Sequence, residues 1–499
     1  MRAWLGALAA VVTAWSSPCV ARAQDGHWLR LESPGFIVYT SGSEQRARSA
    51  AQDLEVFDAL LRRMTDAPAA RSPTKLEIYL LSSDQFHNTF NMGPNIAGFY
   101  RASVDQIAAY EIYSQASGFD GQDVLFHEYA HHFMYQYFNN AYPAWYVEGF
   151  AEFVATAVLG TERITLGRSN AGRFQSLLSG TWLPMERLIT AMPLSLNGTE
   201  MEMFYAQSWL FTHYLVLTPD ANAKFQAYVH ALRQGQAPEA AFQTGFGMTP
   251  AQMQAVLHAY LRSAPNAIAL TRPAAVEQTP ITSSHLSAAA DDLMLPNARL
   301  RQGVQDSERT ALLAHVQQLA ARYPGDAFAT LTLARAEDAL GSHQAARAVL
   351  EPYLAANPND VEALYLEGLS YLRDADDAEG EARLQTLSQA RRYFGRGFHQ
   401  NGNDVPTLYR YAETYNGVGM NDATFDNYVN VLLLAHQLAP QVPDISFGTA
   451  GALMSKGRNA EAIPILRALA YDPHGGAAAQ AAQRMLEQAQ AAAQGEASH

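Results

Sequence analysis

A short pattern recurs at a fixed distance in the C-terminal half of the chain. Pro324-Gly325-Asp326 is followed 34 positions later by Pro358-Asn359-Asp360. A period of this length is typical of repeat architectures, in which one unit cannot bury its apolar face alone and must stack on its neighbours. The repeat therefore predicts a series of stacked helix pairs.

Small residues mark the positions where helices of such a unit pack closely, at Ala334, Gly341 and Ala346. This pattern resembles tetratricopeptide repeats over residues 300–475. The resemblance implies an all-α superhelix whose concave side binds a protein partner or presents substrate. Generic helical hairpins are the alternative. The Ala- and Gln-rich residues 476–499 predict a capping helix with a frayed end.

The N-terminal half mixes strand and helix patterns. Apolar runs predict strands at Phe36–Tyr39 and Leu76–Leu81, apolar spacing predicts a helix over 44–64, and residues 97–112 have the pattern of a hairpin. Beyond these elements the helical period dominates to residue 262. We expect a small α/β unit followed by a helical part.

These patterns divide the chain into an α/β subdomain (24–116), a helical subdomain (117–262) and the repeats. Between the last two, residues 263–299 contain several prolines and little periodicity. This composition predicts a linker or a loosely packed crossover.

Residues 1–23 have the layout of a secretory signal peptide. Met1-Arg2 gives a positive start, Ala3–Trp15 is apolar, and Ala21-Arg22-Ala23 is a small-x-small cleavage site. A buried first helix is the alternative. Cleavage would remove Cys19, the only cysteine, so a metal site must use histidine and carboxylate ligands. We expect an extracytoplasmic protein, periplasmic or secreted.

The charge balance excludes one class of partner. The formal net charge is −14, from 48 acidic and 34 basic residues, and no basic cluster occurs. A nucleic-acid-binding protein needs a basic patch to displace phosphate counterions. After the first 25 residues no stretch is long and apolar enough to span a bilayer. We therefore expect no nucleic-acid partner, and no transmembrane segment after signal cleavage.

His127-Glu128-Tyr129-Ala130-His131 carries the chemistry of the N-terminal half. Residues four apart lie on the same face of a helix, so both imidazoles can reach one metal ion. Glu128 lies at the edge of that face, where it can hold a water molecule without binding the metal itself. The pattern predicts a metal site with Glu128 as the general base.

A second acidic segment follows at the distance of one helical hairpin. Catalytic zinc takes three protein ligands, and Glu148 comes 17 positions after His131. A turn at Asn139-Asn140 would allow the next helix to return Glu148 to the metal. Glu152 shares the face of Glu148 and can accept a hydrogen bond from the far nitrogen of a histidine ligand. A solvated acidic face is the alternative, but the aromatic neighbours indicate a buried helix.

The HExxH motif together with Trp145-x-x-Glu148-Gly-x-Ala-Glu152 resembles the gluzincin metallopeptidases, in particular the aminopeptidase N-like branch and its small bacterial relatives. The resemblance implies a zincin-like α+β domain with Zn²⁺ bound by His127, His131 and Glu148, and with Glu152 as the second choice of acidic ligand. It also implies that Tyr205 donates to the oxyanion of the tetrahedral intermediate; an aromatic core residue is the alternative for Tyr205.

The expected protein is therefore a secreted zinc metallopeptidase with an α+β zincin-like catalytic domain and an all-α tetratricopeptide-like superhelix. The chain lacks the Gly-x-Met-Glu-Asn sequence with which aminopeptidases bind a free N-terminus, so internal cleavage is favoured. One alternative is an inactive peptidase-like scaffold of the cell envelope that acts through its repeats. Another is a zinc hydrolase of non-peptide amides. His132 is expected to point away from the metal and His213 to lie in the core.

Overall fold

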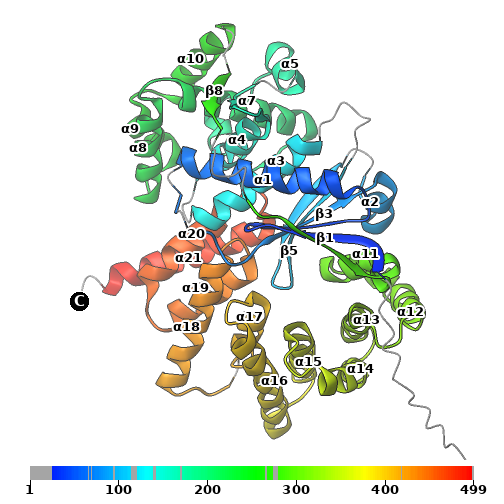
Figure 1. The fold of residues 1–499 in the computed structure, drawn as a ribbon. Coiled ribbons are helices and arrows are strands. Elements are labelled where there is room, and N and C mark those ends of the chain that lie inside the picture. The colour runs from blue at the N-terminus through cyan, green and yellow to red at the C-terminus, as the bar shows by residue number, and fades with distance from the viewer. Residues whose placement is uncertain are drawn as a thin grey trace, which may run out of the picture.

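The computed structural model describes residues 25–65, 67–68, 70–93, 96–113, 121–138, 142–168, 171–263, 267–272, 279–416 and 418–496. In Figure 1 an α/β layer and a helical part form the upper half, and the repeat helices curve around below them. The predicted signal peptide and the turn expected at Asn139-Asn140 lie outside the described residues.

Six strands form the main sheet, in the order β4-β5-β3-β2-β1-β9. Their bounds are Asp25–Glu32 (β1), Phe36–Thr40 (β2), Leu76–Leu81 (β3), Gly98–Ala102 (β4), Ile107–Ile112 (β5) and Thr282–Ser287 (β9). β2, β3 and β5 run parallel, whereas β1, β4 and β9 pair antiparallel with their neighbours. The predicted strands and the hairpin, which corresponds to β4 and β5, are confirmed.

Helices cover both faces of this sheet. One face carries α1 (Glu44–Thr65) and α3 (Gly121–Tyr137), and the other carries α2 (Ser83–Phe90) and α11 (Ala289–Gln302). Alternation along β3 explains both layers, since Ile78 and Leu80 face one core and Tyr79 and Leu81 face the other. Phe57 of α1 stacks on Phe126 of α3 at 4.0 Å between ring centroids, which fixes α3 against the sheet layer.

The helical part is built around a close contact between two buried helices. Its helices are α4 (Ala144–Ala155), α5 (Ala171–Ser179), α6 (Met185–Leu188), α7 (Gly198–Leu217), α8 (Ala221–Arg233), α9 (Pro238–Phe246) and α10 (Pro250–Arg262). Trp145 of α4 stacks on Phe211 of α7 at 4.3 Å. Gly149 lies so near α7 that a Cβ atom would come within 2.3 Å of the Ser208 carbonyl oxygen. The absence of a side chain at Gly149 thus sets the distance between α4 and α7.

The segment predicted as a linker or loosely packed crossover, 263–299, contains regular elements among its described residues, 263, 267–272 and 279–299. It contains β8 (Ile268–Thr271), which completes a small sheet with β6 (Val158–Leu159) and β7 (Arg163–Leu166), then β9 and most of α11. β9 is a polar edge strand that pairs with β1, so it lacks the apolar pattern that marks inner strands. Pro296 lies inside α11, so this proline does not end the helix.

The C-terminal half is a tetratricopeptide-like series of helix pairs. Its helices are α12 (Arg309–Ala320), α13 (Ala327–Leu340), α14 (His343–Ala356), α15 (Val361–Asp374), α16 (Gly380–Gln400), α17 (Val405–Glu413), α18 (Asp422–Leu438), α19 (Pro443–Ser455), α20 (Asn459–Ala470) and α21 (Gly476–Glu496). The aspartate of the recurring pattern has the same role in both units. Asp326 and Asp360 are the N-caps of α13 and α15, and each accepts a backbone N–H three residues on. Asp404 caps α17 in the same way, outside the 34-residue period. The sequence period is therefore a period of helix starts.

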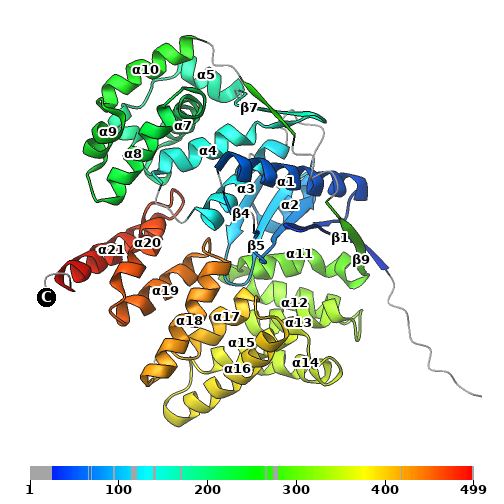
Figure 2. The same ribbon diagram turned by 60° about the vertical axis from the view of Figure 1, so that its left-hand side comes forward.

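One hydrophobic cluster extends from the N-terminal half into the repeats. Val405, Leu408, Leu438 and Ile445 of the repeats belong to the same buried cluster as the helices above the sheet. The turn between β4 and β5 points into the hollow of the repeat arc (Figures 1 and 2). Among the described residues, no helix has both the length and the apolar character that crossing a membrane requires.

Candidate metal centre

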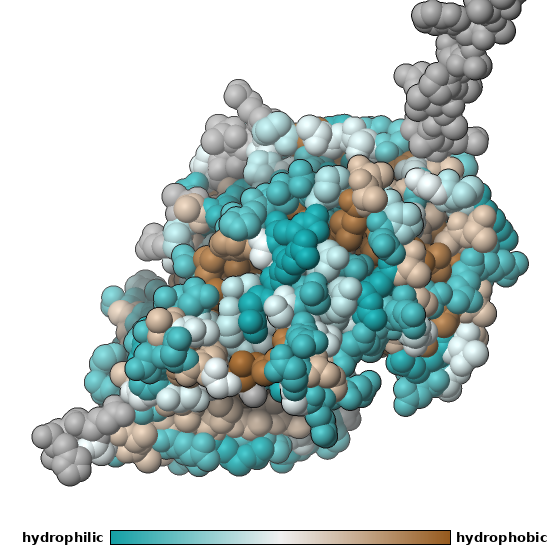
Figure 3. Space-filling view, turned by 90° about the horizontal axis from the view of Figure 1, so that it is seen from below, coloured by the Kyte–Doolittle hydropathy of each residue, from teal (hydrophilic) through white to brown (hydrophobic). Residues whose placement is uncertain are grey.

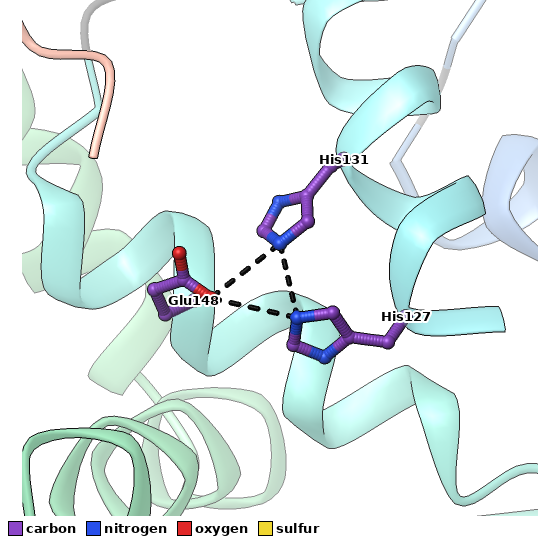
Figure 4. Close-up of side chains that lie close together, drawn as sticks. All are labelled: His127, His131 and Glu148. Atoms are coloured by element: carbon purple, nitrogen blue, oxygen red, sulfur yellow. Dashed lines mark hydrogen bonds and ion pairs between the residues drawn. The ribbon is translucent and has the colours of Figure 1, made fainter. Parts of the chain in front are cut away.

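Three predicted ligands converge between α3 and α4. His127 and His131 lie one turn apart on α3, with 3.0 Å between their Nε2 atoms. Glu148 of α4 places Oε2 3.5 Å from His127 Nε2 and 3.4 Å from His131 Nε2. Figure 4 shows the three side chains directed at one point. All three ligand atoms lie within 4.8 Å of one another, which is the spacing of a group that can hold one metal ion.

Burial makes this cluster costly without a cation. Glu148 is fully buried and His131 is 3% exposed. Among the described residues, both oxygens of Glu148 and Nδ1 of His131 lack a partner in hydrogen-bond geometry. A buried carboxylate needs a charged or hydrogen-bonded partner. Two imidazoles and one carboxylate are also the donor set of a catalytic zinc site, so the residues fit Zn²⁺.

The electrostatics of the cluster agree with this fit. Burial opposes ionisation of Glu148, but the neighbouring His131, His127 and His474 hold the pKa of its carboxyl well below its usual value. Burial likewise opposes the charged form of His127, yet Glu148 and Glu152 raise its pKa to about 9. The site therefore concentrates negative charge where a divalent cation would bind.

Glu152 lies behind His127. Its Oε1 is 3.9 Å from His127 Nδ1, longer than a hydrogen bond, on the side of the ring that faces away from the other ligands. Arg173 of α5 donates two hydrogen bonds to the Glu152 carboxylate, at 2.8 and 3.2 Å. Sequence analysis did not find Arg173, since nothing in its local pattern separates it from a surface arginine.

Tyr205 of α7 lies beside Arg173, the arginine that holds Glu152. It stands two turns into α7 and is half-buried. The Arg173 guanidinium lies 4.9 Å from the centre of its ring. Burial raises the pKa of Tyr205, and the charges of Glu148, Glu152 and Glu128 raise it further. The hydroxyl therefore stays protonated and close to the acidic residues of the site.

A residue from the far end of the chain also enters the site. His474, in the turn between α20 and α21, places Nε2 2.8 Å from Glu148 Oε1. Its ring stands edge-on to His131, with 5.3 Å between centroids. Sequence reasoning missed His474 because it belongs to the repeats, and only the closure of the repeat arc brings it to α4.

The two other histidines lie where they were expected. His132 points away from the ligands, with Nδ1 3.1 Å from the Tyr100 hydroxyl. His213 is fully buried in the core, with its ring nitrogens 2.8 Å from the Tyr260 hydroxyl and 3.1 Å from the Gly167 carbonyl oxygen. Neither contributes to the metal cluster.

Comparison with known proteins adds a likeness to repeat proteins. No family model matches the sequence, and no curated protein matches it. TTC0263, a thermophilic TPR protein of Thermus thermophilus, is 21% identical, with a TM-score of 0.34 over 40% of this chain and 99% of that chain. A MamA mutant structure is 18% identical, with a TM-score of 0.26 over 37% of this chain and 97% of that chain. These scores are low, so the repeat assignment rests on the chain's own helix pairs and their caps.

Fold and site together define a class of protein: an α/β and helical unit with a candidate metal centre, joined to a tetratricopeptide-like repeat region.

Proposed function

We propose that this protein is an exported zinc-dependent metallopeptidase that cleaves polypeptides internally. The observation that carries the proposal is the convergence of His127, His131 and Glu148 on one point, with Glu128 next in sequence to the first ligand. An acidic side chain next to the first metal ligand can act as the general base that takes a proton from the attacking water.

Each residue of the site has a role in this chemistry. Zinc held by the three ligands would supply a Lewis acid that polarises the scissile carbonyl and acidifies a water molecule. Glu128 accepts the proton of the attacking water and passes it to the leaving nitrogen. The Tyr205 hydroxyl donates a hydrogen bond to the oxygen that becomes negative. Arg173 holds the Glu152 carboxylate near Nδ1 of His127, where it helps to orient the ring.

The sheet edge favours an extended peptide as substrate. β4 is one of the two edge strands; among the described residues it pairs with β5 alone, and it contacts α3. An extended chain can add to such an edge through main-chain hydrogen bonds. A hydrolase that acts on other amides would not need this edge.

The direct test compares the full mature chain with Glu128→Gln. The purified proteins are assayed for bound zinc and for cleavage of a mixture of unrelated peptides, with and without chelator. We expect zinc in both proteins and chelator-sensitive internal cleavage in the wild type alone. Equal cleavage by Glu128→Gln would contradict the role of the base, and hydrolysis of small amides without cleavage of any peptide would favour the non-peptide hydrolase.

A second candidate function is binding of a protein partner through the repeats, by a scaffold without peptidase activity. The face seen in Figure 3 is mostly hydrophilic, with small apolar patches. A groove on the repeats is lined by aromatic side chains including Tyr415, Phe425, Tyr428 and Phe447. Aromatic residues are enriched at protein interfaces. Bound zinc without cleavage of any peptide would favour this function.

A further inference from the structure

The two oxygens of Glu148 face different surroundings. Oε2 faces the two histidine ligands, and Oε1 faces the ring of His474 at 2.8 Å. Since Glu148 is fully buried, water does not reach these atoms freely. Among the ion pairs of the described residues, Glu148 has three histidine partners. Two of them, His127 and His131, come from α3, and His474 is the third.

The turn that carries His474 is anchored on the helix that carries the histidine ligands. Asp472 accepts a hydrogen bond from the Tyr135 hydroxyl of α3 at 2.8 Å. The same Oδ1 accepts the backbone N–H of His474 at 2.9 Å. One aspartate therefore connects the position of the His474 main chain to α3, one turn beyond His131.

We propose that His474 is a positioning residue of the metal centre, contributed by the last turn of the repeats. Its imidazole pairs with Glu148 Oε1, 2.8 Å from Nε2, and thereby keeps Oε2 turned toward the metal ion. This inference rests on the proposed zinc site. Groups that hold and orient a metal ligand tune the affinity of the whole site, and their loss costs about 10- to 100-fold in metal affinity.

The inference gives the repeats a role in the site itself. The turn between α20 and α21 contacts the metal ligand Glu148 through His474. A change in how the repeat helices pack would therefore also change the geometry of the metal centre. His474 Nε2 is close to Glu148 Oε1, whereas the histidine ligands face Oε2. This geometry favours a His474 that orients Glu148 over a His474 that binds the metal itself.

The test uses the full mature chain with His474→Ala, His474→Gln and a control, His399→Ala. His399 lies on α16 and is exposed. Zinc affinity is measured by competition with a chromophoric chelator, and the Co²⁺-substituted proteins are compared by visible absorption. Thermal melting of each variant checks that the fold is intact.

We expect His474→Ala to weaken zinc binding about 10- to 100-fold, with an unchanged Co²⁺ spectrum. Glutamine retains a donor at a similar reach, so His474→Gln should recover most of the affinity, and His399→Ala should match the wild type. Equal zinc affinity in wild type and His474→Ala would overturn the inference and leave the proposed function standing. A Co²⁺ spectrum that shows the loss of a nitrogen ligand in His474→Ala would also overturn it. Absence of zinc binding by the wild type would instead refute the proposed function itself.

Discussion

Tyr365 of α15 donates a hydrogen bond to Asp105 in the β4–β5 turn, although the two residues are 260 positions apart in the sequence. Arg410 of α17 lies 3.8 Å from the same carboxylate, and Arg301 of α11 donates to the Asp105 carbonyl oxygen at 3.4 Å. Arg410 and Tyr365 hold the pKa of Asp105 below its usual value against the effect of burial. Residues of α11, α15 and α17 thus bind the β4–β5 turn in the hollow of the repeat arc.

These contacts of Asp105 predict that Asp105→Ala destabilises the whole chain. The substitution leaves the Tyr365 hydroxyl without its acceptor and leaves Arg410 with Glu413 alone, so we expect a loss of about 2 kcal/mol. Chemical denaturation should show one cooperative transition that shifts as a unit. Asp376→Ala, at an exposed position of the repeats, should change stability by less than about 0.5 kcal/mol. Two separate transitions in the wild type would contradict an unfolding unit that joins the two halves.

A second prediction concerns the distance between α4 and α7. Gly149→Ala would place a Cβ atom 2.3 Å from the Ser208 carbonyl oxygen, so α4 must move. We expect a loss of about 1–3 kcal/mol and weaker zinc binding, because Glu148 moves with the helix. Gly395→Ala is the matched control, since a Cβ atom there meets nothing within 4 Å and alanine favours the helix. Unaltered zinc affinity in Gly149→Ala would show that the centre tolerates movement of α4.

A third prediction concerns the support behind α3. Asp58 of α1 is buried, accepts the Tyr129 hydroxyl of α3 at 2.7 Å, and lies 2.9 Å from Arg62 and 2.7 Å from Arg71. Removing one partner of a buried ion pair typically costs about 3–5 kcal/mol. Asp58→Ala should therefore lower the free energy of unfolding by about that amount in a denaturant titration. A change below about 1 kcal/mol would mean that the arginines find other partners.

A fourth prediction concerns pH. Burial lowers the pKa of His213 from 6.5 to about 4 in the folded protein, so the unfolded chain binds a proton between these values and the folded one does not. The stability that depends on this residue is complete above pH 6.5 and is lost as the pH falls towards 4, by about 3 kcal/mol. His213→Gln should melt with a smaller difference between pH 7 and pH 5 than the wild type. An equal difference would place the acid sensitivity in other groups.

Much of the centre could be predicted from local spacing. The fixed geometry of the helix places His127 and His131 on one face, and the length of one hairpin returns Glu148. His474 and Arg173 could not be found, because their partners lie on other elements and no local period connects them. The edge strand β9 was missed for a related reason: its stability comes from main-chain pairing with β1, which leaves no apolar pattern in the sequence.

The most direct test of the central claim is the zinc content of the purified chain and of its ligand variants after equilibrium dialysis. We predict one zinc ion per wild-type chain, retained in Glu128→Gln and lost in His127→Ala, His131→Ala and Glu148→Ala. A wild-type chain that takes up no zinc, or a Glu148→Ala variant that binds it as tightly as the wild type, would contradict the account.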